Sequence, residues 1–410
     1  MPALALAGGV PLRRAPFPAW PPVTDATVRA ITDAVTGGVW GDVDGPRKTE
    51  FERRFADYQG AAHAVGVTNG TTALQIALAA LGIRSGDEVI VPAYTFVATA
   101  TAVLSVNALP IFVDVDPTTG CLDPAAAEAA ITPRTKAVMP VHLGGQPADL
   151  DAFTDLARRH GLALVEDAAQ AHGATWRDRP VGAFGSFGTF SFQASKNLTA
   201  GEGGAVTTDD AELAEIAWSL HHCGRSRQRP WYEHERLGGN HRLTELQAAL
   251  LLDQLDGADT RAERRERSAA LLDAGLADVP GLTPMSRDER CTRHAYHLYQ
   301  LRYKPAEFGG PAREAFVRAL SAEGVPASAG YGRPLDRQRL FAEHRFDERA
   351  TGYDPDYPAT RFGQLDLPHT EQLCAEAVWL PQQVLLGSDE DCADVLAAIR
   401  KVREHADELR

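Results

Sequence analysis

The sequence has 410 residues, of which 44% are hydrophobic and 23% charged, proportions typical of a globular protein with enough chain for more than one domain. Acidic side chains outnumber basic ones by 55 to 41, and the net charge of -14 argues against nucleic acid or an anionic membrane surface as a partner. The five cysteines are scattered and form no CxxC pair, so we expect reduced thiols and a cytoplasmic protein.

The N-terminal end predicts an arm and two helices. Residues 5–23 are rich in proline and glycine and should form an extended segment that lies over other parts of the molecule. Helices are expected at 25–36 and 49–59, with a glycine-containing loop between them. Residues 1–10 lack the basic start of a signal peptide, so no targeting segment is expected.

From residue 64 onward, short apolar runs alternate with helical segments. This alternation predicts right-handed crossovers and a mainly parallel sheet with helices on both faces, an α/β fold. The uncharged stretch 89–113 belongs to this pattern and not to a membrane span, because Pro92, Pro110 and several polar residues interrupt it. The expected strands lie at 64–67, 88–91, 110–113, 137–141 and 162–165.

Asn69-Gly-Thr-Thr-Ala73 stands where the first of these strands passes into a helix. Free backbone N–H groups and the positive end of a helix dipole make such a turn an anion site, so Gly70 and Thr71 are candidates for binding a phosphate. Helix capping by Asn69 or Thr71 is the alternative, and the two roles can coexist. His142 also follows a strand end; we keep it as a candidate substrate contact, with a purely structural role as the alternative.

Residues 162–206 contain the most informative chemistry. An apolar run ends on Glu166 and Asp167, and Lys196 follows a second strand-like segment just before a glycine-rich turn. Ligands of α/β sheets bind at the carboxyl ends of the strands. Pyridoxal phosphate requires a lysine for its Schiff base and a carboxylate that keeps its pyridine nitrogen protonated. A solvated lysine and a turn aspartate are the alternative reading of these two residues.

The composition changes near 257–281, where the alternation gives way to a long polar helix. We therefore expect an extended arm (1–24), a large α/β domain (25–257), a linking helix (258–281) and a small α+β domain (282–410). His221, His222 and Cys223 are adjacent and no second cluster at ligand spacing follows them, so no metal site is expected.

Three segments, TNGTTALQIAL (68–78), VEDAAQAHG (165–173) and SFQASKNLTAGEGGAV (191–206), resemble the DegT/DnrJ/EryC1/StrS family of PLP-dependent aminotransferases. The resemblance extends from Leu4 to about Arg403. It implies the fold-type I architecture, with a mainly parallel seven-stranded sheet and a small C-terminal α+β domain. It also implies that Lys196 and Asp167 are the catalytic residues.

The resemblance assigns further contacts to the cofactor. It implies that Phe96 stacks on the pyridine ring, that Gln170 reaches the phenolic oxygen, and that Ser191 joins Gly70 and Thr71 at the phosphate.

The resemblance also implies a homodimer with shared active sites. Within GGNHRLTELQ (238–247), the matching asparagine is supplied to the phosphate of the neighbouring subunit, a role that would fall to Asn240. Arg242 is a candidate carboxylate or structural partner. Tyr331 opens YGRPLD and is a candidate substrate contact. In the family this segment often ends in histidine, so Asp336 puts the carry-over of substrate contacts in doubt.

The loops around the lysine and the N-terminal text LAGGVPLRRAPFPAWPPV resemble the subgroup that acts on cyclitol ketones or makes aminohydroxybenzoate. We therefore expect transfer of an amino group from L-glutamine or L-glutamate to a scyllo-inosose-like keto-cyclitol in aminoglycoside or related antibiotic biosynthesis. The alternatives are a nucleotide-linked keto-sugar aminotransferase, an aminohydroxybenzoate-synthase-like dehydratase and a non-catalytic PLP-binding regulator.

Overall fold

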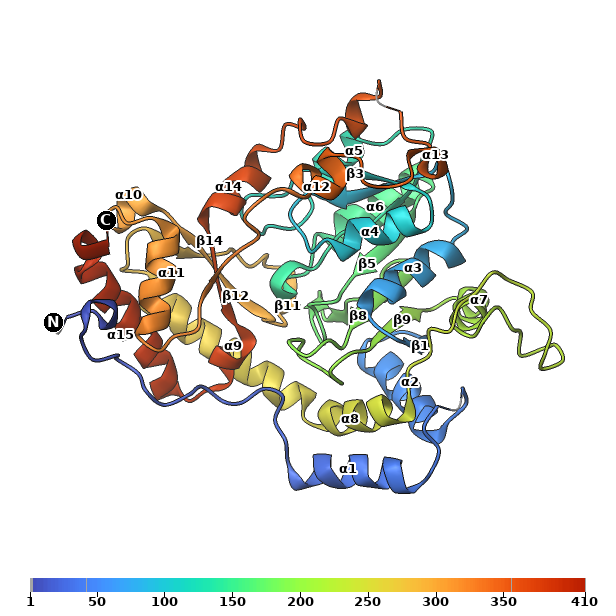
Figure 1. The fold of residues 1–410 in the computed structure, drawn as a ribbon, viewed down its shortest axis with the longest axis horizontal. Helices are drawn as coiled ribbons and strands as arrows, with labels where there is room; N and C mark the ends of the chain where they lie inside the picture. Colours follow the sequence, from blue (N-terminus) through green and yellow to red (C-terminus); the bar gives the residue numbers. More distant parts are fainter. Residues whose placement is uncertain (1–2, 42, 355, 410) are drawn as a thin grey trace.

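A computed structural model describes residues 3–41, 43–354 and 356–409. Its helices and strands form a large sheet covered by helices and a smaller sheet beside it, and both chain ends lie on the side of the smaller sheet (Figure 1). Residues 1, 2 and 410, at the outer ends of the predicted arm and small domain, lie outside the described residues.

The large sheet has seven strands in the order β1-β9-β8-β5-β4-β2-β3. Every neighbouring pair is parallel except the two pairs that β9 makes, so β9 alone runs against the others. The predicted mainly parallel seven-stranded sheet is confirmed. Its strands are β1 (His63–Val67), β2 (Glu88–Pro92), β3 (Leu109–Val113), β4 (Thr135–Val138), β5 (Ala163–Asp167), β8 (Phe187–Ser191) and β9 (Gly204–Thr208).

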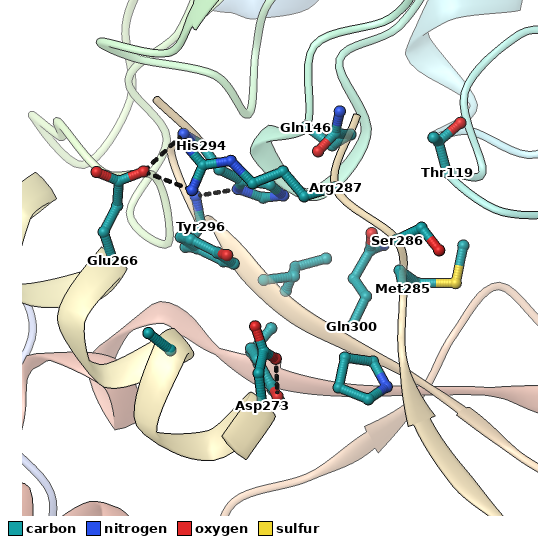
Figure 2. Close-up of a pocket in the computed structure, with 14 residues that line it drawn as sticks. Thr119, Gln146, Glu266, Asp273, Met285, Ser286, Arg287, His294, Tyr296 and Gln300 are labelled. Atoms are coloured by element: carbon teal, nitrogen blue, oxygen red, sulfur yellow. Dashed lines mark hydrogen bonds and ion pairs between the residues drawn. The ribbon is translucent and has the colours of Figure 1, made fainter. Parts of the chain in front are cut away.

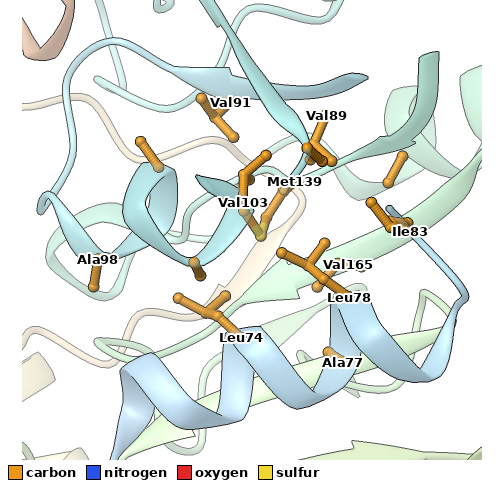
Figure 3. Packing of buried hydrophobic residues seen from close by; sticks show 14 of the residues in the cluster. Leu74, Ala77, Leu78, Ile83, Val89, Val91, Ala98, Val103, Met139 and Val165 are labelled. Carbon is orange, nitrogen blue, oxygen red and sulfur yellow. The ribbon is translucent and has the colours of Figure 1, made fainter. Parts of the chain in front are cut away.

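Helices cover both faces of this sheet. On one face Leu74 and Leu78 of α3 pack with Val103 of α4 against Val89 of β2 and Val165 of β5 (Figure 3). The helices on this face are α3 (Gly70–Ala80), α4 (Ala98–Ser105) and α7 (Ala211–His221). Those on the other are α2 (Pro46–Tyr58), α5 (Pro124–Ala129), α6 (Leu150–His160) and α8 (Glu245–Asp256). Burial on both faces explains why the strands are continuous apolar runs.

Two predicted boundaries shift for local reasons. Helix α2 begins at Pro46, three residues before the prediction, because proline is well suited to the first helical position. Strand β4 ends at Val138 instead of residue 141, since Pro140 has no N–H for the ladder and Val141 makes only an isolated bridge with Asp167.

The smaller sheet is antiparallel, in the order β10-β12-β14-β13. Helix α9 (Ala258–Leu276) leads into it, and its strands are β10 (Leu282–Pro284), β12 (Leu298–Tyr303), β13 (Ser328–Ala329) and β14 (Ala377–Pro381). Helices α11 (Arg313–Ala322) and α15 (Asp389–Glu404) pack with it. A third sheet, β11-β6-β7, links the two parts through β11 (Cys291–Arg293), β6 (Thr175–Trp176) and β7 (Arg179–Pro180).

Part of the predicted small domain packs on the large sheet. Phe341 and Phe362 lie edge-on to Phe112 of β3, with ring centroids 4.9 and 5.4 Å away, and join the core beneath α3 and α4. This segment covers the sheet edge that β3 forms. It contains α12 (Arg339–Ala342), α13 (Glu348–Thr351) and α14 (Pro368–Glu376). The domain boundaries themselves stay a prediction.

The N-terminal arm crosses the smaller part of the molecule before α1 (Asp25–Thr36) begins (Figure 1). The carboxylate of Glu323 accepts hydrogen bonds from the backbone N–H groups of Ala5 and Leu12 and pairs with Lys401 at 2.7 Å. The remaining short elements are α10 (Pro305–Phe308) and the 3-10 turns at Ala5–Ala7, Leu143–Gly145, Leu335–Arg337, Pro358–Thr360, Gln382–Leu386 and Ala406–Leu409. No helix in the described ranges has both the length and the apolar character needed to cross a membrane.

Candidate active site

The principal candidate residues gather at the carboxyl edge of the large sheet. Asp167 is the last residue of β5 and Ser191 the last of β8, while Gly70 opens α3 directly after β1. Lys196 follows β8 in a loop. This is the edge at which α/β sheets bind ligands.

Asp167 is a buried carboxylate, only 5% exposed. The Thr99 hydroxyl donates to its Oδ2 at 2.8 Å and the Ala169 N–H donates to its Oδ1 at 3.2 Å. Burial raises the pKa of Asp167, and these two hydrogen bonds together with the charge of Lys196 oppose the rise. The site thus holds a carboxylate for which a cationic partner is favourable. Thr99, in the first turn of α4, had no distinguishing signal in the sequence.

Lys196 lies close enough to Asp167 for each charge to act on the other. Burial lowers the pKa of Lys196 to about 8, and the attraction of Asp167 opposes the shift. An amine with this pKa has a substantial neutral fraction near physiological pH, which a nucleophile or general base requires.

The backbone of Lys196 is held from two distant parts of the chain. The indole N–H of Trp20 in the N-terminal arm donates to the Lys196 carbonyl oxygen at 3.1 Å, and the side-chain amide of Gln382 donates to the same oxygen at 3.3 Å. The buried Arg265 in turn donates to Gln382 Oε1 at 3.1 Å. We call Trp20, Gln382 and Arg265 the lysine clamp. Sequence reasoning missed it, since its members come together only in the folded chain.

Gly70 and Ser191 are in direct contact, where a side chain on Gly70 would not fit. A Cβ at Gly70 would lie 2.7 Å from the Ser191 Cβ. Asn69 caps the helix by accepting from the Thr72 N–H at 2.9 Å. The first amides of α3, those of Gly70 and Thr71, therefore remain for an outside acceptor beside the Ser191 hydroxyl. Capping and anion binding thus use different groups of the same turn.

Gln170 and Tyr331 line the site on the side of the smaller sheet. The Gly144 N–H donates to Gln170 Oε1 at 2.6 Å. Burial raises the pKa of Tyr331, a hydrogen bond with Gln170 opposes the rise, and the charge of Asp167 adds to it. The ring of Tyr331 lies edge-on to Trp379, with centroids 4.8 Å apart. Tyr331 therefore lies between Gln170 and Trp379 of β14.

Phe96 is 57% exposed, and its ring borders an open hollow of about 470 Å³. Tyr331, Arg333 and Leu335 also line this hollow. An exposed aromatic ring beside the other candidates has a free face for stacking.

Two neutral histidines stand beside Lys196. Burial and the nearby lysine charge lower the pKa of His172 to about 3, and burial together with Lys196 and His172 holds the pKa of His297 well below its usual range. Neither ring nitrogen of His172, nor Nδ1 of His297, has a hydrogen-bond partner among the described residues. Buried polar atoms without partners are uncommon, which favours a polar ligand here.

His142, the candidate substrate contact that follows a strand end, lies inside the protein. Its ring is fully buried, Nδ1 accepts from the Ala148 N–H at 3.0 Å, and Nε2 lies 3.2 Å from the Glu166 carboxylate. Glu166 also accepts from the N–H groups of Gly182, Phe184 and Gly185. Both ring nitrogens of His142 are thus occupied within the protein, which favours the structural alternative.

Asn240 and Arg242 contact His222, and neither of these contacts involves Lys196. Asn240 is exposed and forms a bridge with His222, and Arg242 Nη1 lies 3.0 Å from His222 Nδ1. Within one chain, none of these contacts connects them to Lys196. In the described part of the chain, no three or more His, Cys, Asp or Glu side chains are grouped to hold a metal ion.

The chain is similar to known proteins over nearly its whole length. A model of the DegT/DnrJ/EryC1/StrS aminotransferase family matches residues 23–400. The chain is 42% identical over 421 residues to the L-glutamine:2-deoxy-scyllo-inosose aminotransferase of Streptomyces paromomycinus, with 98% of each chain covered. It is 41% identical over 430 residues to the L-glutamine:scyllo-inosose aminotransferase of Streptomyces griseus, with 99% of each covered.

A similar solved structure is that of 3-amino-5-hydroxybenzoic acid synthase. It shares 38% sequence identity with the chain, has a TM-score of 0.87, and aligns with 96% of this chain and 100% of that one.

Proposed function

Because the chain belongs to the DegT/DnrJ/EryC1/StrS aminotransferase family, we propose that it transfers the amino group of L-glutamine to a keto-cyclitol of the scyllo-inosose type, in the biosynthesis of an aminoglycoside or related antibiotic. The observation that carries this proposal is the full-length similarity, at 41–42% identity, to enzymes named for that donor and that kind of acceptor. The five free cysteines support a reducing, cytoplasmic setting.

The cofactor we propose is pyridoxal phosphate, and the residues present fit it. Lys196 would hold it covalently, Asp167 would hold its ring nitrogen protonated, and the α3 amides with Ser191 would receive its phosphate. Phe96 would stack on the ring, and Gln170 would meet the phenolic oxygen. The unpartnered nitrogens of His172 and His297 support a polar occupant in this space. When bound, this cofactor supplies an electron sink for negative charge on the substrate carbon that carries the nitrogen.

Lys196, Asp167 and the lysine clamp have different roles in the proposed reaction. Lys196 Nζ, whose lowered pKa leaves a substantial neutral fraction near physiological pH, takes a proton from the α-carbon of the amino donor and returns a proton to the corresponding carbon of the product. Asp167, held by Thr99 and Ala169, keeps a negative charge opposite. The lysine clamp fixes the carbonyl from which the Lys196 side chain is positioned.

The hollow beside Phe96 and Tyr331 is the proposed entrance for the acceptor. Its volume of about 470 Å³ and its lining of aromatic, aliphatic and guanidinium groups accommodate a small polyhydroxylated ketone. Tyr331 is the proposed substrate contact, since it joins this hollow to Gln170.

We further propose a homodimer that completes its active sites across the interface. The segment before Asn240 carries large apolar side chains that one chain leaves exposed: Trp231 at 72%, Tyr232 at 75% and Leu237 at 100%. It projects from the body of the molecule in the region after α7 (Figure 1). A partner that covers these side chains would receive Asn240 at its phosphate end, with Arg242 supporting the segment.

The similarity to 3-amino-5-hydroxybenzoic acid synthase supports a second candidate, a dehydratase-like reaction on the same scaffold. The test is the visible spectrum of purified protein. We expect a cofactor band that L-glutamine bleaches and that a keto-cyclitol, but no nucleotide-linked keto-sugar, restores. Lys196→Ala should lack the band of the lysine-bound cofactor. A band that no amino donor changes would favour the dehydratase or regulatory alternative, and recovery with a nucleotide-linked sugar alone would overturn the keto-cyclitol.

A further inference from the structure

A second cavity lies away from the residues discussed so far. It has a volume of about 160 Å³ and is bounded by α9, β12 and the loops around residues 146 and 286 (Figure 2). None of the candidate active-site residues lines it.

The buried floor of this cavity contains an amide oxygen that lacks a hydrogen-bond partner. Gln146 is only 2% exposed; its Nε2 donates to the Pro147 carbonyl, but its Oε1 has no hydrogen-bond partner among the described residues. Gln300 is also buried, and its side chain lines the cavity. An unsatisfied buried amide costs about 1–3 kcal/mol, so such groups normally face water or a ligand.

The rim of the cavity is more negative than positive. Glu266 and Asp273 project from α9, and Arg287 is the only cation among the lining residues (Figure 2). Arg287 is already engaged, with Glu266 at 2.9 Å and with the Cys291 and Thr292 carbonyls at 2.9 and 2.8 Å. Asp273 accepts from the Tyr299 hydroxyl at 2.6 Å through one oxygen, which leaves the other available. A cation is therefore favoured over a carboxylate or a phosphate.

One residue in the wall of the cavity has a strained backbone. Tyr296 stacks on His294, with centroids 3.8 Å apart, and holds a φ of 46°, which is rare for a non-glycine residue. Strain of this kind is found preferentially where a side chain is aimed at a ligand. Pro284, Met285 and Leu298 supply apolar surface.

We propose that this cavity binds a small protonated amine that carries several hydroxyl groups, with the ammonium at Asp273 and the hydroxyls on the amides of Gln146 and Gln300. The ligand class follows from the lining side chains alone. That the occupant is the amine product of the enzyme's own reaction rests on the proposed function.

A ligand in this cavity would be connected to the active site through the short turn Leu143–Gly145. Gln146 comes two residues after Gly144, at the end of the 3-10 turn Leu143–Gly145, and the Gly144 N–H donates to Gln170. The Gln300 side chain packs so closely on Gly144 that a Cβ there would lie 2.7 Å from it. A ligand bound to the side chains of Gln146 and Gln300 would therefore affect the position of the Gly144 backbone, whose N–H donates to Gln170.

The test is calorimetric titration of the holoenzyme with scyllo-inosamine. myo-Inositol, which has hydroxyl groups but no amine, is the uncharged control. Hydrogen exchange measured by mass spectrometry would locate the bound amine. We expect two equivalents of amine per chain, one of which protects residues 284–300, and weaker binding of myo-inositol at that second site.

Asp273→Asn should lower the affinity for the second equivalent of amine about tenfold or more. Gln300→Met keeps the length of the side chain and the charge of the rim, and it should also lower this affinity. Asp278→Asn, which removes the same charge from an exposed position beyond α9, should change nothing. A single equivalent that Asp273→Asn leaves unchanged, or protection confined to peptides around Lys196, would overturn the proposal. Because hydrogen exchange locates the second equivalent away from Lys196, this result is independent of which ketone the enzyme aminates.

Discussion

At the scale of single residues, the most consequential pair is Lys196 and Asp167. Their spacing in sequence suggested a lysine that faces a carboxylate, and the structure brings them close enough to influence each other's charge. The sequence could not reveal Thr99 as the donor to Asp167, because a hydroxyl 68 positions away carries no local signal. It also could not show that His142 would be buried with both nitrogens occupied.

The lowered pKa of Lys196 predicts a pH profile. In cofactor-free protein, the rate at which an amine-specific reagent modifies Lys196 should rise with pH and reach half its maximum near pH 8, because only the neutral amine reacts and the folded pKa is about 8. An ordinary lysine would titrate near about 10.4. Peptide mass spectrometry would follow Lys196, with the exposed Lys136 as an internal reference.

Asp167→Asn should move this profile to lower pH, since the carboxylate raises the lysine pKa against the effect of burial. It should also reduce turnover by about 10²-fold or more. A profile that stays in place in Asp167→Asn would show that the two charges do not interact.

At the scale of elements, the start of α3 against the end of β8 is the tightest contact of the site. Gly70→Ala would place a methyl group 2.7 Å from the Ser191 Cβ, so one of the two elements must move. We expect the affinity for the cofactor, measured by equilibrium dialysis, to fall about tenfold or more. Gly41→Ala, at an exposed glycine with open space around it, is the matched control. Unchanged affinity in Gly70→Ala would exclude this turn from the phosphate site.

The N-terminal arm makes a second prediction at this scale. Trp20→Phe removes the indole donor to the Lys196 carbonyl and leaves Gln382 in place. Backbone exchange at residues 192–200 should become about two- to tenfold faster, and kcat should fall more than KM changes, because one net hydrogen bond contributes about 1 kcal/mol.

Trp40→Phe removes an equivalent indole hydrogen bond, to the Val35 carbonyl, far from the lysine loop, and should leave both quantities unchanged. Equal effects from the two substitutions would mean that the arm stabilises the protein without positioning the lysine.

Most helices and strands of the large sheet could be predicted from the sequence, because their apolar runs and caps are local signals. Helix α1 has the expected bounds, with Thr24 forming a capping box at its start. The course of residues 335–367 could not be predicted: Phe341 and Phe362 are apolar residues in a loop-rich segment, and only their contact with Phe112 shows which sheet they cover.

At the scale of the whole molecule, the exposed segment before Asn240 predicts shared active sites. In the proposed homodimer, Lys196→Ala and Asn240→Glu should each abolish activity, the second by placing a carboxylate near the partner's phosphate site. Unfolding and refolding them together should restore activity, because one site of the mixed dimer then has both a wild-type lysine and a wild-type asparagine. No recovery, with mixed dimers verified by native mass spectrometry, would contradict a site built from two chains.

The transferred nitrogen can be followed with an isotope label. Holoenzyme would be incubated with L-glutamine labelled with ¹⁵N at the α-amino group and with scyllo-inosose or its 2-deoxy form, and the products analysed by mass spectrometry. We predict an aminocyclitol that carries one ¹⁵N, formed by the wild-type protein and not by Lys196→Ala. A cyclitol amine without the label, or label found only in a nucleotide-linked sugar, would contradict the proposed reaction.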